Sequence, residues 1–181
     1  FGVLPPVSKL TQEQAMFYFV LGYTAKLAGT EIGVKEPQAT FSSCFGAPFM
    51  LRHPREYAKL LGHYLEKYNI QVWLINTGWT GGSFGVGQRF PLHVTREIIR
   101  TIQAGKLDHM EMKKDPIFGL SIPKKVNNVA PTLLNPRKNW EDGKKYDEVA
   151  ETLAKSFHQQ MVTFGDFYKE NINGAPTYNG Q

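Results

Sequence analysis

The glycine-rich segment from Asn76 to Arg89 is the part of the sequence best suited to chemistry. Five of the ten residues 78–87 are glycine, and glycine lets the backbone adopt positive φ and lets a ligand approach the peptide amides closely. Arg89 ends the segment with a permanent positive charge and a fork of donors that suits phosphate or a base edge. These features predict one wall of a nucleotide site. The alternative is a plain hairpin or surface loop.

The neighbours of this segment favour the ligand-binding interpretation. Residues 72–75 (Val-Trp-Leu-Ile) directly precede it and are typical of a buried strand. A helical pattern follows at about 95–104, with its apolar face formed by Ile98, Ile99 and Ile102. Loops between a strand and a helix are where α/β proteins bind many of their ligands.

The segment does not match the phosphate-binding loop of nucleoside triphosphatases. That loop needs two glycines five positions apart, followed by lysine and then serine or threonine, to hold phosphate and Mg²⁺. Gly82 and Gly87 have this spacing, but Gln88 and Arg89 follow them. The segment alone therefore cannot build a centre for phosphoryl transfer.

Thr95 has two candidate roles at the start of the predicted helix. As the N-cap it would accept a hydrogen bond from one of the first helical amides. Its hydroxyl could also face a ligand that lies over the helix N-terminus. The two roles are compatible.

Other reactive side chains give weaker signals. Ser42, Ser43 and Cys44 could act as nucleophiles, but no histidine stands in a partner motif, and Cys44 is expected to be a small buried residue. Glu31 and Glu36 could pair as acid and base, although surface carboxylates are more common. The five histidines do not have the spacing of a metal site.

Composition sets the broad class of the protein. The chain has 181 residues, 41% of them hydrophobic, a net charge of +5 and a single cysteine. The single cysteine excludes an internal disulfide and fits a cytoplasmic location. No apolar run is long enough to span a membrane. The basic excess suits an anionic partner such as a nucleotide, a nucleic acid or a small acid.

Periodicity predicts four helices. The first begins after Thr11, which forms a capping box with Gln14, and its apolar spacing continues to Gly29. The second begins at Pro54 and continues to about residue 68, the third is the one at 95–104, and the last spans about 146–164. A short strand is expected near 119–122, and the rest of the stretch 106–139 is expected to be rich in loops.

Several blocks of the sequence resemble ATP-dependent phosphoenolpyruvate carboxykinases. They are residues 1–11, 22–31, 36–46 and 76–82, and the pair Thr95-Arg96 that opens a helix. The blocks occur in the order that the family has and span most of the chain. The part from about Lys113 onward matches more loosely.

The resemblance implies a mixed α/β fold, with residues 1–181 as the C-terminal portion of a mononucleotide-binding domain that is incomplete as a domain. The absence of an initial methionine supports the same expectation. The family converts oxaloacetate and ATP to phosphoenolpyruvate, ADP and CO₂ with Mg²⁺ and Mn²⁺, a decarboxylating reaction of gluconeogenesis. The implied partners are these small molecules and the upstream part of the same enzyme, with no membrane and no nucleic acid.

The resemblance also implies three contacts to the adenosine end of ATP, at Arg89, Phe90 and Thr95. The contact at Phe90 is expected to use its backbone, which would tolerate different side chains. One departure is Gln88, where the family usually has lysine before the arginine.

The resemblance places the family's phosphate loop, metal ligands and dicarboxylate-binding arginines upstream of Phe1. No catalytic residue and no metal ligand is therefore expected in this segment, and the 181-residue chain alone is expected to be inactive. Two alternatives are a stand-alone module that binds a nucleotide or RNA through its basic glycine-rich loop, and a structural domain in which this loop is only a connection.

Overall fold

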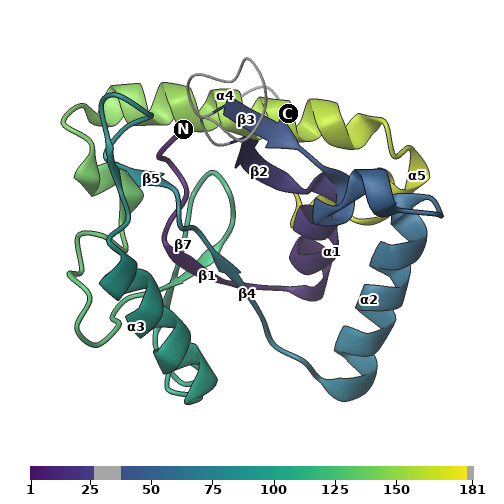
Figure 1. The fold of residues 1–181 in the computed structure, drawn as a ribbon, viewed down its shortest axis with the longest axis horizontal. Coiled ribbons are helices and arrows are strands. Elements are labelled where there is room, and N and C mark those ends of the chain that lie inside the picture. The colour runs from purple at the N-terminus through teal and green to yellow at the C-terminus, as the bar shows by residue number, and fades with distance from the viewer. Residues whose placement is uncertain (27–37, 179–181) are drawn as a thin grey trace. The chain divides into compact units, whose positions relative to one another are not determined.

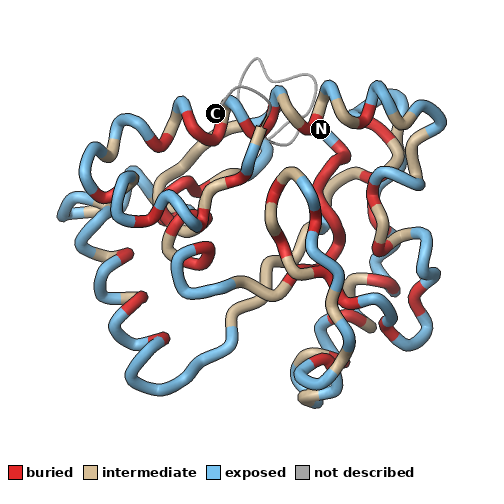
Figure 2. The backbone as a smooth tube through the Cα atoms, turned by 180° about the vertical axis from the view of Figure 1, so that it is seen from behind, coloured by how far each residue is buried: buried red, intermediate tan, exposed pale blue. Residues whose placement is uncertain are grey.

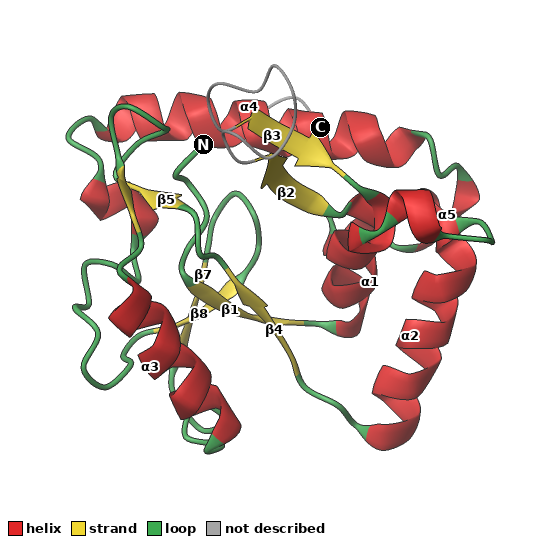
Figure 3. Ribbon diagram, in the orientation of Figure 1, coloured by secondary structure: helices red, strands yellow, loops and turns green. Residues whose placement is uncertain are grey.

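The computed structural model describes residues 1–26 and 38–178, which divide into two compact units. The first unit contains residues 1–9 and 73–153 and the segment that begins at Thr177, and the second contains residues 10–72 and 154–176. Helices and strands contribute to both units (Figure 3). The mixed α/β fold class expected from the sequence is therefore confirmed.

A four-stranded sheet organises the first unit (Figure 1). Its order is β4-β1-β8-β7, and the strands are β1 (Val7–Leu10), β4 (Val72–Ile75), β7 (Met112–Lys114) and β8 (Ser121–Pro123). β8 is antiparallel to both of its neighbours, and it places Ser121 opposite Lys9 of β1. The chain leading into β1 is buried without interruption from residue 2 to residue 8 (Figure 2).

Helix α3 (Leu92–Gln103) contributes its apolar face to the core of this unit. Val94 and Ile98 are buried there, and Ile102 packs against the same cluster. Burying one such side chain contributes about 1.5–3 kcal/mol, so this stripe fixes the helix on the sheet. The buried members of the cluster are Val7, Val94, Ile98, Leu107, Ile122, Val126, Val129 and Leu134.

Two smaller elements and part of a long helix complete the first unit. β5 (Trp79–Thr80) and β6 (Gln88–Arg89) pair in an antiparallel hairpin. The 3₁₀ helix η3 (Pro136–Asn139) precedes α4 (Gly143–Val162). Residues 143–153 of α4 belong to this unit.

The second unit is mainly helical. Its longer helices are α1 (Gln12–Leu21), α2 (Pro54–Tyr68) and the remainder of α4. α1 and α2 come close together, because Gly62 lies against Met16 and its carbonyl accepts a hydrogen bond from Gln12 at 3.0 Å. The other elements are β2 (Tyr23–Lys26), β3 (Gln38–Phe41), η1 (Ser43–Phe45), η2 (Ala47–Phe49), α5 (Asp166–Glu170) and η4 (Ile172–Gly174).

The start of the first predicted helix is confirmed, but its end is not. Thr11 and Gln14 form the expected capping box. The helix then ends at Leu21, because Gly22 adopts the left-handed conformation and its N–H returns to the carbonyl of Tyr18 at 3.0 Å. Residues 23–26, predicted as helix, form strand β2 instead, and Gly29 lies outside the described residues.

The other predicted elements are present, and some of them have shifted ends. The second helix has its predicted bounds, and Asn69 ends it in the left-handed conformation. The predicted strand at 72–75 is β4, although it is only half-buried at the edge of the sheet. The strand predicted at 119–122 is β8, and the last helix begins earlier than predicted, at Gly143. Within the described residues, no helix is long and apolar enough to cross a membrane.

Candidate functional site

The glycine-rich segment forms the β5–β6 hairpin. Trp79 lies directly opposite Arg89, and Thr80 lies directly opposite Gln88. Because side chains alternate along a strand, Arg89 shares one face of the hairpin with Trp79, while Gln88 shares the other face with Thr80. The hairpin alternative considered from the sequence is thus correct for the backbone, and Arg89 stands beside an aromatic ring.

The base of the hairpin is closed by hydrogen bonds around Gly78. The N–H of Phe90 donates to the Gly78 carbonyl at 2.9 Å, and the N–H of Gly78 donates to the Asn76 side chain at 2.9 Å. The Asn76 amide in turn donates to the Leu4 carbonyl at 2.8 Å. These bonds hold both ends of the hairpin and so fix the point where the chain leaves toward α3.

The glycines of the hairpin are explained mostly by close backbone packing. A Cβ on Gly87 would lie 2.6 Å from the Thr80 carbonyl oxygen and would overlap the Gly82 carbonyl. A Cβ on Gly2 would overlap the same Gly82 carbonyl. At the tip, by contrast, Gly85 has φ near +85° and nothing within 4 Å of its missing Cβ. Close packing therefore explains Gly2 and Gly87, whereas Gly85 lies in open space at the tip of the hairpin.

An aromatic pair stabilises the hairpin on the face that Arg89 shares. Trp79 meets Phe84 edge to face, with ring centroids 5.4 Å apart. Pairs of this geometry contribute about 0.5–1.5 kcal/mol beyond their buried area. Phe84 itself is exposed, so the pair leaves aromatic surface accessible near Arg89.

The three residues predicted to bind adenosine follow one another at the exit of the hairpin. Arg89 is exposed and, among the described residues, forms no ion pair. Phe90 has a buried side chain, 6% exposed, and its N–H is already bonded to Gly78. A backbone contact from Phe90 to a ligand would therefore use the carbonyl. Thr95 is half-buried in the first turn of α3.

Thr95 is not the N-cap of α3, so this sequence prediction is wrong. The helix begins at Leu92 because Pro91, with φ fixed near −60°, occupies the cap position. The N–H groups of Val94 and Thr95 both donate to the Pro91 carbonyl, at 3.0 and 3.3 Å. No side chain caps this helix start and no acidic residue lies in its first turn, which leaves a positive helix end beside Arg89.

The other candidates from the sequence have structural roles or lie outside the described part. Cys44 is buried as expected, and burial raises the pKa of its thiol, which keeps it protonated. The Ser42 hydroxyl accepts a hydrogen bond from Ala47. Glu31 and Glu36 lie outside the described residues.

The first unit contains a cavity of about 680 Å³ that was not predicted from the sequence. Its lining comes from the stretch 113–138, expected only to be rich in loops, and from the start of α4. Lysines interspersed with prolines in this stretch were the available signal. Arg89, Phe90 and Thr95 are not among the lining residues.

Comparison with known proteins identifies the family. The profile of the phosphoenolpyruvate carboxykinase family matches residues 1–132. The chain belongs to the ATP-dependent phosphoenolpyruvate carboxykinases. It is 55% identical to the phosphoenolpyruvate carboxykinase (ATP) of Alkaliphilus oremlandii over 97% of its own length and 33% of that protein. It is 51% identical to the one from Caldanaerobacter subterraneus subsp. tengcongensis, over 97% of its length and 34% of that protein.

The similarity to carboxykinases covers the hairpin and its exit completely. Arg89, Phe90 and Thr95 all lie inside the stretch that matches the family. A third relative, the carboxykinase (ATP) of Shouchella clausii, is 54% identical over 91% of the chain and 31% of its own length. The chain thus spans about one third of the length of the curated carboxykinases it matches.

Proposed function

We propose that this chain forms the adenosine side of the ATP site in an ATP-dependent phosphoenolpyruvate carboxykinase. That enzyme would convert oxaloacetate and ATP to phosphoenolpyruvate, ADP and CO₂. The observation that carries the proposal is Arg89, which is exposed, free of ion pairs among the described residues, and followed by an uncapped helix start. Family membership makes a nucleotide the natural ligand for this arrangement.

Arg89 is the main binding residue in this proposal. Its guanidinium carries five donors and remains charged at any physiological pH. It can therefore donate to the acceptors of a purine edge, a ribose or a phosphate. Trp79 lies directly opposite, so the same face offers an aromatic ring against which a base could pack.

Phe90 and Thr95 would complete the contacts from either side of Pro91. The buried ring of Phe90 fixes the backbone at the hairpin exit, and its carbonyl remains available as an acceptor. The hydroxyl of Thr95 can donate or accept a hydrogen bond. The positive end of α3 would favour the negative charge of ATP.

The chain's contribution to the reaction would be binding and orientation. Among residues 1–26 and 38–178, no three His, Cys, Asp or Glu side chains gather in a way that could hold a metal ion. The described residues therefore do not by themselves form a site with three such ligands for the Mg²⁺ and Mn²⁺ that the family resemblance implies. Binding energy from the remote adenosine end helps to position a reacting phosphate.

The experiment that tests the proposal is a titration of the chain with ATP, followed by NMR. All three tryptophans lie in the first unit, and we expect ATP to shift the indole N–H signal of Trp79 most. Arg89→Gln should lower ATP affinity about tenfold or more, as loss of a charged hydrogen bond predicts. Arg100→Gln, an exposed change in the last turn of α3, is the matched control. Equal affinities for the two variants would refute the proposal.

The same titration distinguishes a nucleic-acid module. An RNA-binding surface that neutralises several phosphates loses affinity steeply as salt concentration rises. We expect ATP to compete fully with any bound oligonucleotide and the salt dependence of ATP binding to be shallow. Oligonucleotide binding that ATP does not displace would favour the alternative.

A further inference from the structure

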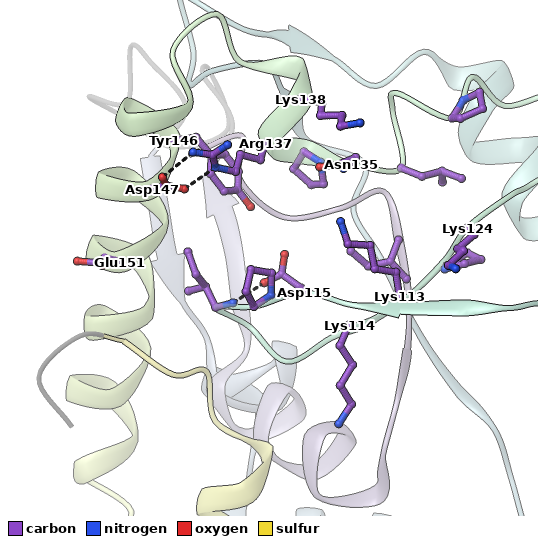
Figure 4. Close-up of a pocket in the computed structure, with 17 residues that line it drawn as sticks. Lys113, Lys114, Asp115, Lys124, Asn135, Arg137, Lys138, Tyr146, Asp147 and Glu151 are labelled. Atoms are coloured by element: carbon purple, nitrogen blue, oxygen red, sulfur yellow. Dashed lines mark hydrogen bonds and ion pairs between the residues drawn. The ribbon is translucent and has the colours of Figure 1, made fainter.

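The 680 Å³ cavity of the first unit has three walls (Figure 4). One wall comes from β7, β8 and the turn that joins them, a second from the loop at 131–135 with η3, and a third from the start of α4. Small-molecule sites in proteins commonly have volumes of roughly 300–1,000 Å³. The size alone therefore permits a metabolite.

Most of the cavity wall is apolar and stiff. Proline supplies no N–H donor and has a fixed φ, so these walls offer a ligand shape and apolar contact but few hydrogen bonds. Such walls suit the carbon skeleton of a ligand rather than its charged group. The apolar lining residues are Pro116, Ile117, Ile122, Pro123, Pro131, Leu134 and Pro136.

Several charged side chains around the cavity already have partners within the protein. Arg137 forms a bidentate ion pair with Asp147 of α4, with N–O distances of 2.8 and 2.9 Å. Lys124 pairs with Glu111. The carboxylate of Asp115 accepts hydrogen bonds from the backbone N–H groups of Ile117 and Phe118, at 3.0 and 2.7 Å.

Three lysines at the cavity remain without an ion pair among the described residues: Lys113, Lys114 and Lys138. Burial raises the pKa of the Asp115 carboxyl, and the nearby charge of Lys113 partly opposes that shift without forming a contact ion pair. Lys113 and Lys114 leave β7 in opposite directions, and Lys113 points toward the wall that carries Asn135 (Figure 4). A positive charge from one wall therefore faces the amide side chain of Asn135 on the other (Figure 4).

We propose that this cavity binds a small organic anion, with a carboxylate or phosphate group between Lys113, Asn135 and Lys138 and an apolar body against the prolines. The site shares no residue with Arg89, Phe90 and Thr95, so the inference does not depend on the proposed nucleotide function. A neutral ligand would leave the lysine charges without a counter-charge, and an inorganic anion would leave water in contact with the apolar walls.

Trp140 provides a local reporter for this site. Its indole N–H donates to the Gly2 carbonyl at 2.9 Å, and its ring meets Tyr146 edge to face at 5.9 Å. Tyr146 lines the cavity. A ligand in the cavity should therefore shift the Trp140 indole signal and leave the Trp79 signal unchanged.

The test is an NMR titration of the chain with hydrocinnamate, phenyl phosphate, neutral hydrocinnamamide and inorganic phosphate. We expect both organic anions to shift the Trp140 signal and to bind about tenfold more tightly than the amide or inorganic phosphate, as charged hydrogen bonds combined with apolar contact predict. Failure of both organic anions to shift Trp140 at millimolar concentration would overturn the proposal.

Charge-removing variants then locate the binding group. Lys113→Gln and Lys138→Gln should each weaken binding of the organic anions about fivefold to tenfold. Lys125→Gln, an exposed lysine outside the cavity lining, is the control and should bind like the original chain. All of these positions are exposed, so folding is expected to be retained, and the thermal midpoint checks this. Binding by both cavity variants that is as strong as binding by the original chain would contradict the site.

Discussion

Arg89 lies directly opposite Trp79 in the β5–β6 hairpin, while its neighbour Gln88 lies opposite Thr80 on the other face. The Thr80 hydroxyl accepts a hydrogen bond from Asn139 at 3.1 Å. One face of the hairpin is therefore turned to the protein's own η3 segment, and the face with Arg89 and Trp79 carries the exposed cation. We therefore expect a bound nucleotide to contact the face with Arg89 and Trp79 rather than the face with Gln88 and Thr80.

Restoring the lysine that the family usually has at position 88 should change ATP binding only slightly. Gln88 is exposed and points away from the face of Arg89, so Gln88→Lys adds a screened charge rather than a direct contact. We expect the dissociation constant for ATP to fall by about twofold or less at physiological salt, which calorimetry can measure. A tenfold gain would mean that position 88 contacts the nucleotide.

Thr95→Val should separate ligand binding from helix capping. Because Pro91 occupies the cap position of α3, loss of the Thr95 hydroxyl should change the free energy of unfolding by no more than about 0.5 kcal/mol. Loss of a true N-cap threonine would cost about 1 kcal/mol. Urea unfolding followed by tryptophan fluorescence measures this, and ATP affinity should fall in the same variant. Lower stability with unchanged affinity would reverse this assignment.

Two glycine substitutions in the hairpin should have different consequences. Gly87→Ala places a Cβ against the carbonyls of Thr80 and Gly82, so the hairpin must open and the Trp79 indole signal should move even without ligand. Gly85→Ala meets open space and carries only the strain of its positive φ, roughly 1–2 kcal/mol. Its Trp79 signal should stay in place. The same Trp79 shift in both variants would argue against close packing as the reason for Gly87.

Asp115 should make the protein's stability depend on pH in an unusual direction. Burial raises the pKa of this carboxyl above its usual 3.8, and the backbone amides of Phe118 and Ile117 and the charge of Lys113 only partly oppose that shift. The native state therefore holds this proton more tightly than the unfolded state does. The contribution of Asp115 is greatest below the unfolded pKa and is lost as the pH rises through the raised, native value.

Asp115→Asn tests this dependence, because the amide oxygen can still accept from Ile117 and Phe118. The unfolding free energy of the original chain relative to this variant should fall as the pH rises from about 4 toward neutrality. Urea unfolding at several pH values gives this difference directly. A difference that is constant or rises with pH would show that hydrogen bonding, rather than burial, dominates at this carboxyl.

The sequence predicted elements well where local signals agree with packing. The Thr11–Gln14 capping box and the Pro54 helix start both depend on a few adjacent residues, and both are present. The strand before the hairpin was predicted because four apolar residues stand together. The family resemblance was confirmed by relatives that are 51–55% identical.

The incorrect predictions have physical causes that lie outside the few adjacent residues on which each prediction was based. Helical spacing continues past Gly22, but the left-handed conformation of this residue ends α1 and lets Tyr23 pair with Phe41 of β3. Thr95 resembled a cap, yet Pro91 starts α3 one turn earlier. Hydrophobic periodicity could not predict the cavity, because its walls come from residues 113–151 and no regular sequence pattern relates these residues.

We propose above all that Arg89, Phe90 and Thr95 contact the adenosine end of ATP. Intermolecular NOEs between bound ATP and the chain, recorded at saturating nucleotide, test it most directly. We predict contacts from the adenine and ribose protons to the side chains of Arg89, Thr95 and Trp79. Contacts only to residues elsewhere, such as those around Lys113 in the cavity, or the absence of any contact, would contradict the claim.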